Sequence, residues 1–232
     1  MKKLCIIPAR GQSKRFPRKN IVLINDKPLL VYSIEVALKA KLFDLVVVST
    51  EDEEIASIAA KAGASIHKRN PKFASDECRL TQVCLNVLEY FMDQGNFYDI
   101  FCLLQPTCPL RSVNDLHKSY ALLDRKNANY VISICEFEDS PFWALGVNEE
   151  NFLYLFFGDE YLVPRQKLPE IYRHNGSIIW ARTQIFLKEK EFFKGSRAVG
   201  YKMPLEKSLD IDYPYQKLIV ETLLNKESTI RK

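Results

Sequence analysis

A cluster of positively charged side chains follows the first apolar run of the chain. The run covers residues 4–8, and basic residues then lie at Arg10, Lys14, Arg15, Arg18 and Lys19. Gly11 and Ser13 lie among them, and such small residues let the backbone approach an anion closely while the cations supply charge. A basic loop directly after a buried strand therefore predicts a phosphate-binding site, whereas a Lys/Arg run elsewhere is often only a solvated loop.

Two acidic side chains, Asp210 and Asp212, lie near the other end of the chain. In an extended segment, residues two apart point to the same side, so both carboxylates can face one site. Carboxylate oxygens beside phosphate groups are suitable ligands for Mg²⁺, with water in the remaining positions. Mn²⁺ is the other candidate cation. The alternative is that Asp212 only caps a helix expected from Tyr213, and one carboxylate can serve both roles.

The elements that must position these residues follow an α/β pattern. The strands expected from apolar, β-branched runs cover residues 4–8, 45–49, 64–67, 100–104, 130–135 and 177–181. The helices expected from apolar periodicity cover residues 28–39, 53–62, 80–92, 113–123 and 213–224. This alternation predicts a mostly parallel sheet with helices on both faces. Ligands of such sheets bind beyond the carboxyl ends of the strands, where the basic loop and residues 105–111 are expected.

Composition limits the class of protein. With 232 residues, 47% of them hydrophobic, the chain is expected to form one domain over residues 1–232. The net charge of +4 is too balanced for a dedicated nucleic-acid binder. No segment looks like a secretory signal or a membrane span. Six cysteines without CxxC spacing indicate reduced thiols, and we expect a cytoplasmic protein.

Residues 138–172 differ in character from the rest of the chain. They contain three prolines and several aromatic residues without helical periodicity, among them Phe142, Trp143 and Phe156. This pattern predicts an inserted β-ribbon with apolar side chains that need a partner surface. The alternative is that the ribbon folds back over its own domain.

Five motifs in this order resemble the acylneuraminate cytidylyltransferases, the CMP-sialic acid synthetase family. The matching segments are 7–14 with Pro17, Lys19 and Asn20; 104–111; 164–166 with 168–169; Arg173 with 175–176; and 209–212. The resemblance extends over most of the chain. It implies a Rossmann-like nucleotidyltransferase fold and a homodimer in which the inserted ribbon extends toward the partner's active site. It also implies that CTP and a nine-carbon 2-keto sugar acid give a CMP-sugar and pyrophosphate, without nucleic-acid or membrane partners.

The resemblance also implies roles for individual residues. Those expected to bind the nucleotide are Ala9, Arg10, Gly11, Ser13, Lys14, Lys19, Asn20 and Arg69. Those expected to bind the sugar are Gln105, Arg165, Arg173 and Asn175, with Arg165 acting across the dimer. The catalytic residues would be Arg10, Lys19, Asp210 and Asp212, and the two aspartates would hold the metal. These types suit in-line phosphoryl chemistry, which depends on positioning, charge neutralisation and a carboxylate that accepts the hydroxyl proton.

Departures from the family pattern concern the sugar. Residues 77–80 replace the small hydroxyl residues that usually follow Asp76, and Phe142-Trp143 lie where some sialic-acid enzymes have a lysine. A tryptophan there favours a less polar sugar, such as the 9-deoxy legionaminic or pseudaminic acid. We therefore expect one of these substrates ahead of N-acetylneuraminate.

Three other functions are open. A 3-deoxy-manno-octulosonate cytidylyltransferase fits the Asp-Ile-Asp segment and residues 164–166 less well. A sugar-nucleotide-dependent glycosyltransferase shares the core, but its acidic pair normally follows a central strand. An RNA-binding regulator would use the basic loop and bind with a steep salt dependence, but it leaves Asp210 and Asp212 unexplained. The dinucleotide and P-loop glycine motifs are both absent from the sequence.

Overall fold

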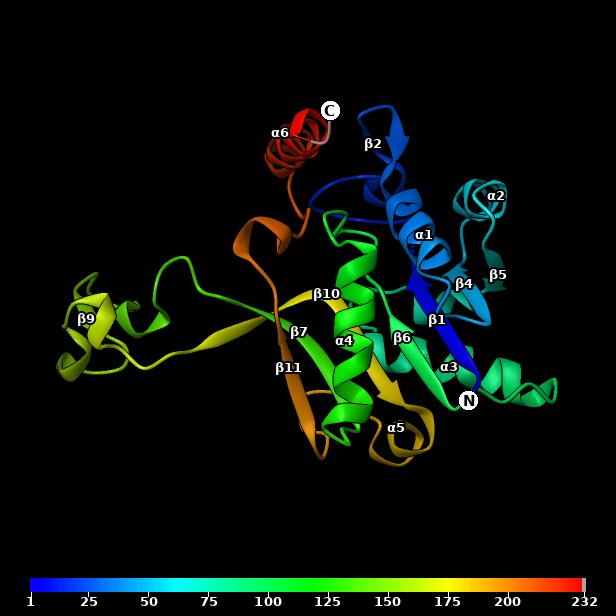
Figure 1. Ribbon diagram of the computed structural model, residues 1–232. Coiled ribbons are helices and arrows are strands. Elements are labelled where there is room, and N and C mark those ends of the chain that lie inside the picture. Colours follow the sequence, from blue (N-terminus) through cyan, green and yellow to red (C-terminus); the bar gives the residue numbers. More distant parts are fainter. Residues whose placement is uncertain (231–232) are drawn as a thin grey trace.

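A seven-stranded sheet forms the centre of the protein in the computed structural model, which describes residues 1–230 (Figure 1). The strand order is β11-β7-β10-β6-β1-β4-β5. The strands are β1 (Lys3–Pro8), β4 (Leu45–Thr50), β5 (Ser65–Lys68), β6 (Ile100–Leu103), β7 (Tyr130–Glu136), β10 (Tyr172–Arg182) and β11 (Ala198–Lys202). Neighbouring strands are parallel except that β10 runs antiparallel to both β6 and β7. The predicted, mostly parallel sheet is therefore confirmed.

Strand β1 illustrates why these sequences form inner strands. Successive side chains alternate between the two faces of a sheet, so a strand covered on both faces needs apolar residues throughout. Leu4 and Ile6 pack into the apolar cluster on one face, and Cys5 and Ile7 pack into the cluster on the other. All four side chains are fully buried.

Helices cover both faces of the sheet. The face with Cys5 and Ile7 is packed by α1 (Leu29–Ala40), α2 (Glu53–Lys61) and α4 (Val113–Arg125). The opposite face is packed by α3 (Leu80–Asp93) and α5 (Thr183–Glu189). The last helix, α6 (Pro214–Ile230), packs against the hairpin of β2 (Leu23–Ile24) and β3 (Lys27–Pro28), as Figure 1 shows.

The sequence-based elements differ from the structure in several places. Strand β10 begins at Tyr172, so residues 173–176 lie inside the strand and not before it. Its pairing with β7 shifts between His174 and Ile179, and this bulge contains Gly176, which interrupts the β-branched pattern. The segments β11 and α5 were not predicted, and α6 begins one residue later and extends farther than expected.

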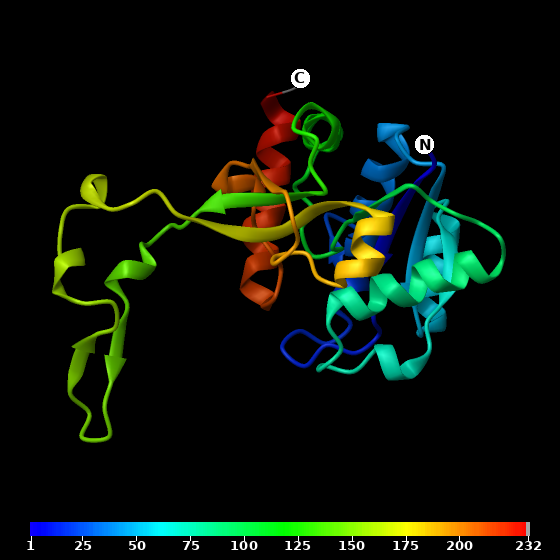
Figure 2. The same cartoon turned by 90° about the horizontal axis from the view of Figure 1, so that it is seen from below.

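Residues 138–171, called the arm, project from the sheet between the end of β7 and the start of β10 (Figure 2). The arm contains the antiparallel strands β8 (Leu145–Val147) and β9 (Leu153–Leu155) and short 3₁₀ turns, including Pro141–Trp143 and Arg165–Lys167. The rings of Phe142 and Tyr161 stack with centroids 4.3 Å apart. Phe152, Leu153 and Phe156 are more than half exposed. The predicted use of this segment in dimerisation stays a prediction.

The cysteines and the lengths of the helices bear on the class of protein. All six cysteines are free thiols, and five of them are buried. Within residues 1–230, every helix is too short or too polar to cross a membrane.

Candidate active site

The basic loop lines a cavity of ≈ 760 Å³ beside the carboxyl ends of β1 and β4. Arg10, Ser13 and Lys14 line it together with acidic residues that include Glu51. The backbone N–H of Gly11 donates to Glu51 Oε1 at 2.7 Å. A Cβ atom at Gly11 would lie 2.5 Å from Asp52 Oδ2, so the close approach of this backbone to the Asp52 side chain requires glycine.

Asp76 neutralises two of the predicted phosphate-binding cations. The carboxylate lies 2.7 Å from Arg10 Nη1 and 2.7 Å from Lys14 Nζ. Hydrogen bonding to Lys14, together with the charge of Arg10, holds the pKa of Asp76 below its ordinary value. The pairing brings Arg10 and Lys14 to one point, as expected of groups that bind a polyanion. Asp76 was not among the site residues predicted from the sequence.

Three further nucleotide-site residues lie beneath the loop. Asn20 is buried, and its amide donates to the carbonyl of Arg10 at 2.9 Å. The Ala9 N–H donates to the Ser49 carbonyl at 2.9 Å. The buried Arg69 guanidinium donates to Ser49 Oγ at 3.1 Å and to the Ser49 carbonyl. These contacts shape the cavity, and direct contact of Asn20 or Arg69 with a nucleotide stays a prediction.

The Asp212 side chain, close to the C-terminal end of the sequence, contacts two cations of the basic loop. Its Oδ1 accepts from Lys19 Nζ at 2.6 Å, and its Oδ2 lies 3.0 Å from Arg15 Nη2. Asp212 is not needed to accept hydrogen bonds from the N–H groups at the start of α6. Gln216 Oε1 accepts from the N–H groups of Asp212 and Tyr213 at 2.6 and 2.7 Å. The Asp212 carboxylate therefore faces cations, and the contact with Arg15 was missed although the residue belongs to the basic loop.

Asp210 lies beside Asp212 with one oxygen unused. Between them Ile211 is fully buried and its N–H donates to the Thr107 carbonyl at 2.9 Å, whereas both aspartates are half-buried. Among the described residues, Asp210 Oδ1 is buried without a hydrogen-bond partner. Burial, with the nearby Asp210 charge, raises the pKa of Cys108 to about 12. A buried acceptor without a donor, next to a second carboxylate, fits a bound divalent cation.

Gln105 follows β6 and lies against the bulge of β10. Its carbonyl accepts hydrogen bonds from the buried Arg111 guanidinium and from Ser33 Oγ. Gly176 has φ +70°, and a Cβ atom there would lie 2.7 Å from the Gln105 amide nitrogen. Glycine is therefore required for this packing as well as for the backbone conformation.

Arg173 and Asn175 differ in their availability for a ligand. Arg173 is half-buried, and its side chain forms no hydrogen bond or ion pair with the described residues 1–230. Asn175 is buried, and its Oδ1 accepts from Ser133 Oγ at 2.6 Å while its Nδ2 donates to Ser208 Oγ at 2.8 Å. These bonds favour a positioning role for Asn175, and direct sugar contact by either residue stays a prediction.

Arg165 lies at the neck of the arm. Its guanidinium donates to the carbonyls of Glu138 and Phe137 at 2.6 and 2.8 Å. It lines a separate cavity of ≈ 470 Å³ together with Tyr172, and the cavity beside the basic loop has other lining residues. Arg165 is thus a predicted site residue that does not line the cavity beside the basic loop.

Sequence comparisons with known proteins identify the family of this chain. Residues 4–194 match the cytidylyltransferase family. The chain is 37% identical over 213 residues to the pseudaminic acid cytidylyltransferase of Campylobacter jejuni, covering 91% of both chains. It is 33% identical over 212 residues to the N-acylneuraminate cytidylyltransferase of Escherichia coli, covering 90% of this chain and 49% of the relative.

A solved structure shares the fold at low identity. The CTP complex of CMP:2-keto-3-deoxy-manno-octonic acid synthetase superposes with a TM-score of 0.72 at 16% identity, covering 98% of this chain and 100% of the other. This likeness supports the Rossmann-like nucleotidyltransferase fold. The family match and the identity to the curated relatives show that the chain belongs to the acylneuraminate cytidylyltransferase family of nucleotidyltransferases.

Proposed function

We propose that the protein transfers CMP from CTP to the anomeric hydroxyl of a nonulosonic acid and releases pyrophosphate, with Mg²⁺ as the cofactor. The observation that carries the proposal is the meeting of Lys19 with Asp212 beside the unpartnered carboxylate oxygen of Asp210. Lysine and carboxylate groups that would bind a triphosphate and a metal thus lie together at the carboxyl edge of the sheet. This is where an α/β sheet binds its ligands.

The basic loop would bind the triphosphate. Arg10 and Lys14 would exchange the Asp76 carboxylate for phosphate oxygens, and Gly11 and Ser13 line the same cavity. Lys19 lies nearer the acidic pair and would neutralise charge where the bond to pyrophosphate breaks. Fixed charges at such a point stabilise the transition state without reorganisation.

Asp210 and Asp212 would hold the divalent cation. When bound, Mg²⁺ supplies Lewis-acid polarisation of the phosphate at the reacting phosphorus. Asp210 would also accept the proton of the sugar hydroxyl as the new O–P bond forms. Gln105 and the unpaired Arg173 would orient the sugar, and Arg165 of a second subunit would bind its carboxylate.

The sugar is proposed to be a 9-deoxy nonulosonic acid, with pseudaminic acid first. The pseudaminic acid enzyme of Campylobacter jejuni is 37% identical, whereas the CMP-N,N'-diacetyllegionaminic acid synthase of Legionella pneumophila is 29% identical over 235 residues. Trp143 is consistent with an apolar sugar contact. Its Nε1 donates to the Tyr161 carbonyl at 3.0 Å, so an apolar ring lies on the arm in place of a lysine.

The test is product formation from CTP and Mg²⁺ with four acceptors, namely pseudaminate, legionaminate, N-acetylneuraminate and 3-deoxy-manno-octulosonate. We expect CMP-sugar and pyrophosphate with pseudaminate, and loss of both with EDTA or in Asp212→Ala. Preference for N-acetylneuraminate would refute the proposed sugar, and preference for the octulosonate would favour the alternative enzyme. No product with any acceptor, from a protein that still binds CTP, would refute the transferase proposal.

A further inference from the structure

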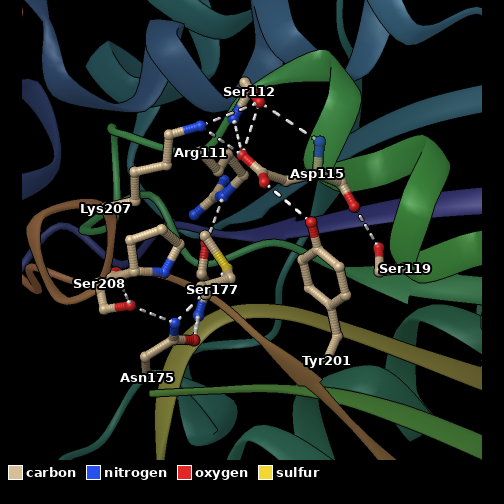
Figure 3. A network of polar contacts seen from close by, with 11 residues as sticks. Arg111, Ser112, Asp115, Ser119, Asn175, Ser177, Tyr201, Lys207 and Ser208 are labelled. Carbon is tan, nitrogen blue, oxygen red and sulfur yellow. Dashed lines mark hydrogen bonds and ion pairs between the residues drawn. The ribbon is translucent and has the colours of Figure 1, made fainter. Parts of the chain in front are cut away.

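A buried carboxylate, Asp115, connects helix α4 to the acidic segment, residues 208–212. Asp115 is 5% exposed, and its Oδ2 accepts from the N–H and Oγ of Ser112 at 2.8 and 2.6 Å. Its Oδ1 accepts from the Tyr201 hydroxyl at 2.9 Å, and Lys207 Nζ lies 3.3 Å from Oδ2 (Figure 3). Two of its three partner residues thus come from the chain that leads into the acidic segment.

Helix capping explains only half of this arrangement. Ser112 and Asp115 form a complete capping box for α4, and this needs neither Lys207 nor Tyr201. Burial alone would raise the pKa of Asp115, but hydrogen bonds from Ser112 and Tyr201 and the Lys207 charge lower it. The carboxylate is therefore charged, and removal of one partner from a buried ion pair is costly.

Asn175 provides a second side-chain contact to this part of the chain, at Ser208, the residue that follows Lys207. Its Nδ2 donates to Ser208 Oγ at 2.8 Å, and this hydroxyl donates to the Pro204 carbonyl at 2.7 Å. Ser208 is fully buried. In Figure 3 the Lys207 and Ser208 side chains point to different partners, Asp115 on α4 and Asn175 on β10.

The acidic segment itself has no regular secondary structure between the 3₁₀ turn Leu205–Lys207 and α6. Within it, Ile211 is held by its buried side chain and its bond to Thr107. Side-chain contacts therefore take the place of a helix or strand in fixing where the two aspartates lie. Loss of one contact would therefore allow movement of the backbone that carries Asp210 and Asp212.

We propose that the Asp115–Lys207 ion pair and the Asn175–Ser208 hydrogen bond are positioning devices that hold Asp210 and Asp212 in place for the divalent cation. This rests on the proposed function, because it takes the two aspartates as the metal ligands. Groups that orient metal ligands commonly change metal affinity or activity about 10- to 100-fold when removed. Asp115 and Lys207 are thus positioning residues, and neither of them lines the cavity beside the basic loop.

The first experiment measures the segment without any ligand. Lys207→Met keeps the capping box but removes the ion pair, and Lys118→Met, an exposed lysine on α4, is the matched control. Hydrogen exchange of the amides in residues 205–212 should be faster in Lys207→Met than in the wild type and unchanged in the control. Lys207→Arg should restore slow exchange. Exchange that stays slow in Lys207→Met would overturn the inference, whatever happens to the melting temperature.

The second experiment measures Mn²⁺ binding in the presence of CTP by electron paramagnetic resonance. We expect about tenfold weaker binding in Lys207→Met, binding within about twofold of the wild type in Lys207→Arg, and weaker binding also in Ser208→Ala. Unchanged Mn²⁺ affinity in both Lys207→Met and Ser208→Ala would overturn the inference.

The two proposals fail in different ways. A wild-type protein that binds Mn²⁺ and CTP but modifies no nonulosonic acid refutes the proposed reaction and leaves the exchange and Mn²⁺ comparisons valid. Wild-type Mn²⁺ binding that is unaffected by Asp212→Asn would overturn the metal site and the positioning inference together.

Discussion

Lys19 and Asp212 form an ion pair of 2.6 Å across 193 positions of the sequence. The lysine is held by the 3₁₀ turn Lys19–Ile21, and the aspartate lies just before α6. Their side chains are only 15% and 28% exposed, so the pair is shielded more than a typical surface ion pair. The contact joins the two segments whose chemistry was most evident in the sequence.

Removal of the Asp212 charge should abolish transfer with little effect on folding. Asp212→Asn keeps the shape but weakens the attraction for Lys19 and for a divalent cation. We expect kcat to fall at least about 100-fold, the scale found for the loss of one group that stabilises transition-state charge. The assay is pyrophosphate release at saturating CTP and Mg²⁺. Asp93→Asn, an exposed carboxylate in the last turn of α3, is the control, and an equal loss of activity there would contradict the prediction.

Asp76 should compete with CTP for the basic loop. Asp76→Asn leaves Arg10 and Lys14 without their internal partner, so CTP should bind more tightly. Because these groups are partly exposed, the expected change is about two- to fivefold in Kd, and it should shrink as salt is added. Calorimetric titration of CTP at low and high ionic strength measures it. Weaker binding by the variant would instead indicate that Asp76 supports the loop.

Arg165 should act across a dimer. Neither Arg165→Ala nor Asp212→Ala alone is expected to be active, but a mixed dimer contains one site with both residues intact. Random mixing makes half the dimers mixed, so roughly a quarter of the wild-type activity should return. Subunits carrying different tags allow the mixed dimer to be purified and assayed. If mixing restores no activity, Arg165 acts within its own chain or not at all.

His67 should make the protein less stable in acid. The side chain is 2% exposed, and burial and the Arg69 charge lower its pKa from 6.5 to about 4. Between pH 6.5 and 4 the unfolded chain binds the proton more readily than the folded protein, so folding stability falls as pH falls. The loss from this group should be about 1.4 kcal/mol per pH unit in that range.

Chemical denaturation at pH 7 and pH 5 measures the effect. His67→Asn should reduce the difference in unfolding free energy between the two pH values, whereas His117→Asn, at an exposed position on α4, should leave it unchanged. An equal pH dependence in His67→Asn and the wild type would contradict the prediction.

The sequence predicted the parallel part of the fold because its signals are local. Apolar runs such as residues 45–49 become inner strands, and Asp52 caps α2 by accepting from the Ile55 N–H at 3.0 Å. Strand β11 was missed because Gly200 and polar neighbours interrupt its apolar pattern. Its position depends on pairing with β7, which is a contact between distant segments.

The site was only partly predictable for the same reason. The basic loop and the aspartate pair could be recognised from residue type and spacing. Asp76 and Arg15 matter through partners elsewhere in the chain, and a single charge in a polar stretch gives no signal of such pairing. Asp115 looked like an ordinary residue in the first turn of a helix, and its contacts with Tyr201 and Lys207 exist only in the folded protein.

The reversed direction of β10 has a consequence for the arm. Because β10 is antiparallel to β7, the arm leaves and rejoins the sheet at two residues that pair directly, Glu136 and Tyr172. The connection is therefore an elongated hairpin, and its length and surface can vary while the core register stays fixed. Exchange of the arm between relatives at these two residues should preserve folding. Acceptor preference can therefore change through replacement of the arm while the core sheet stays the same.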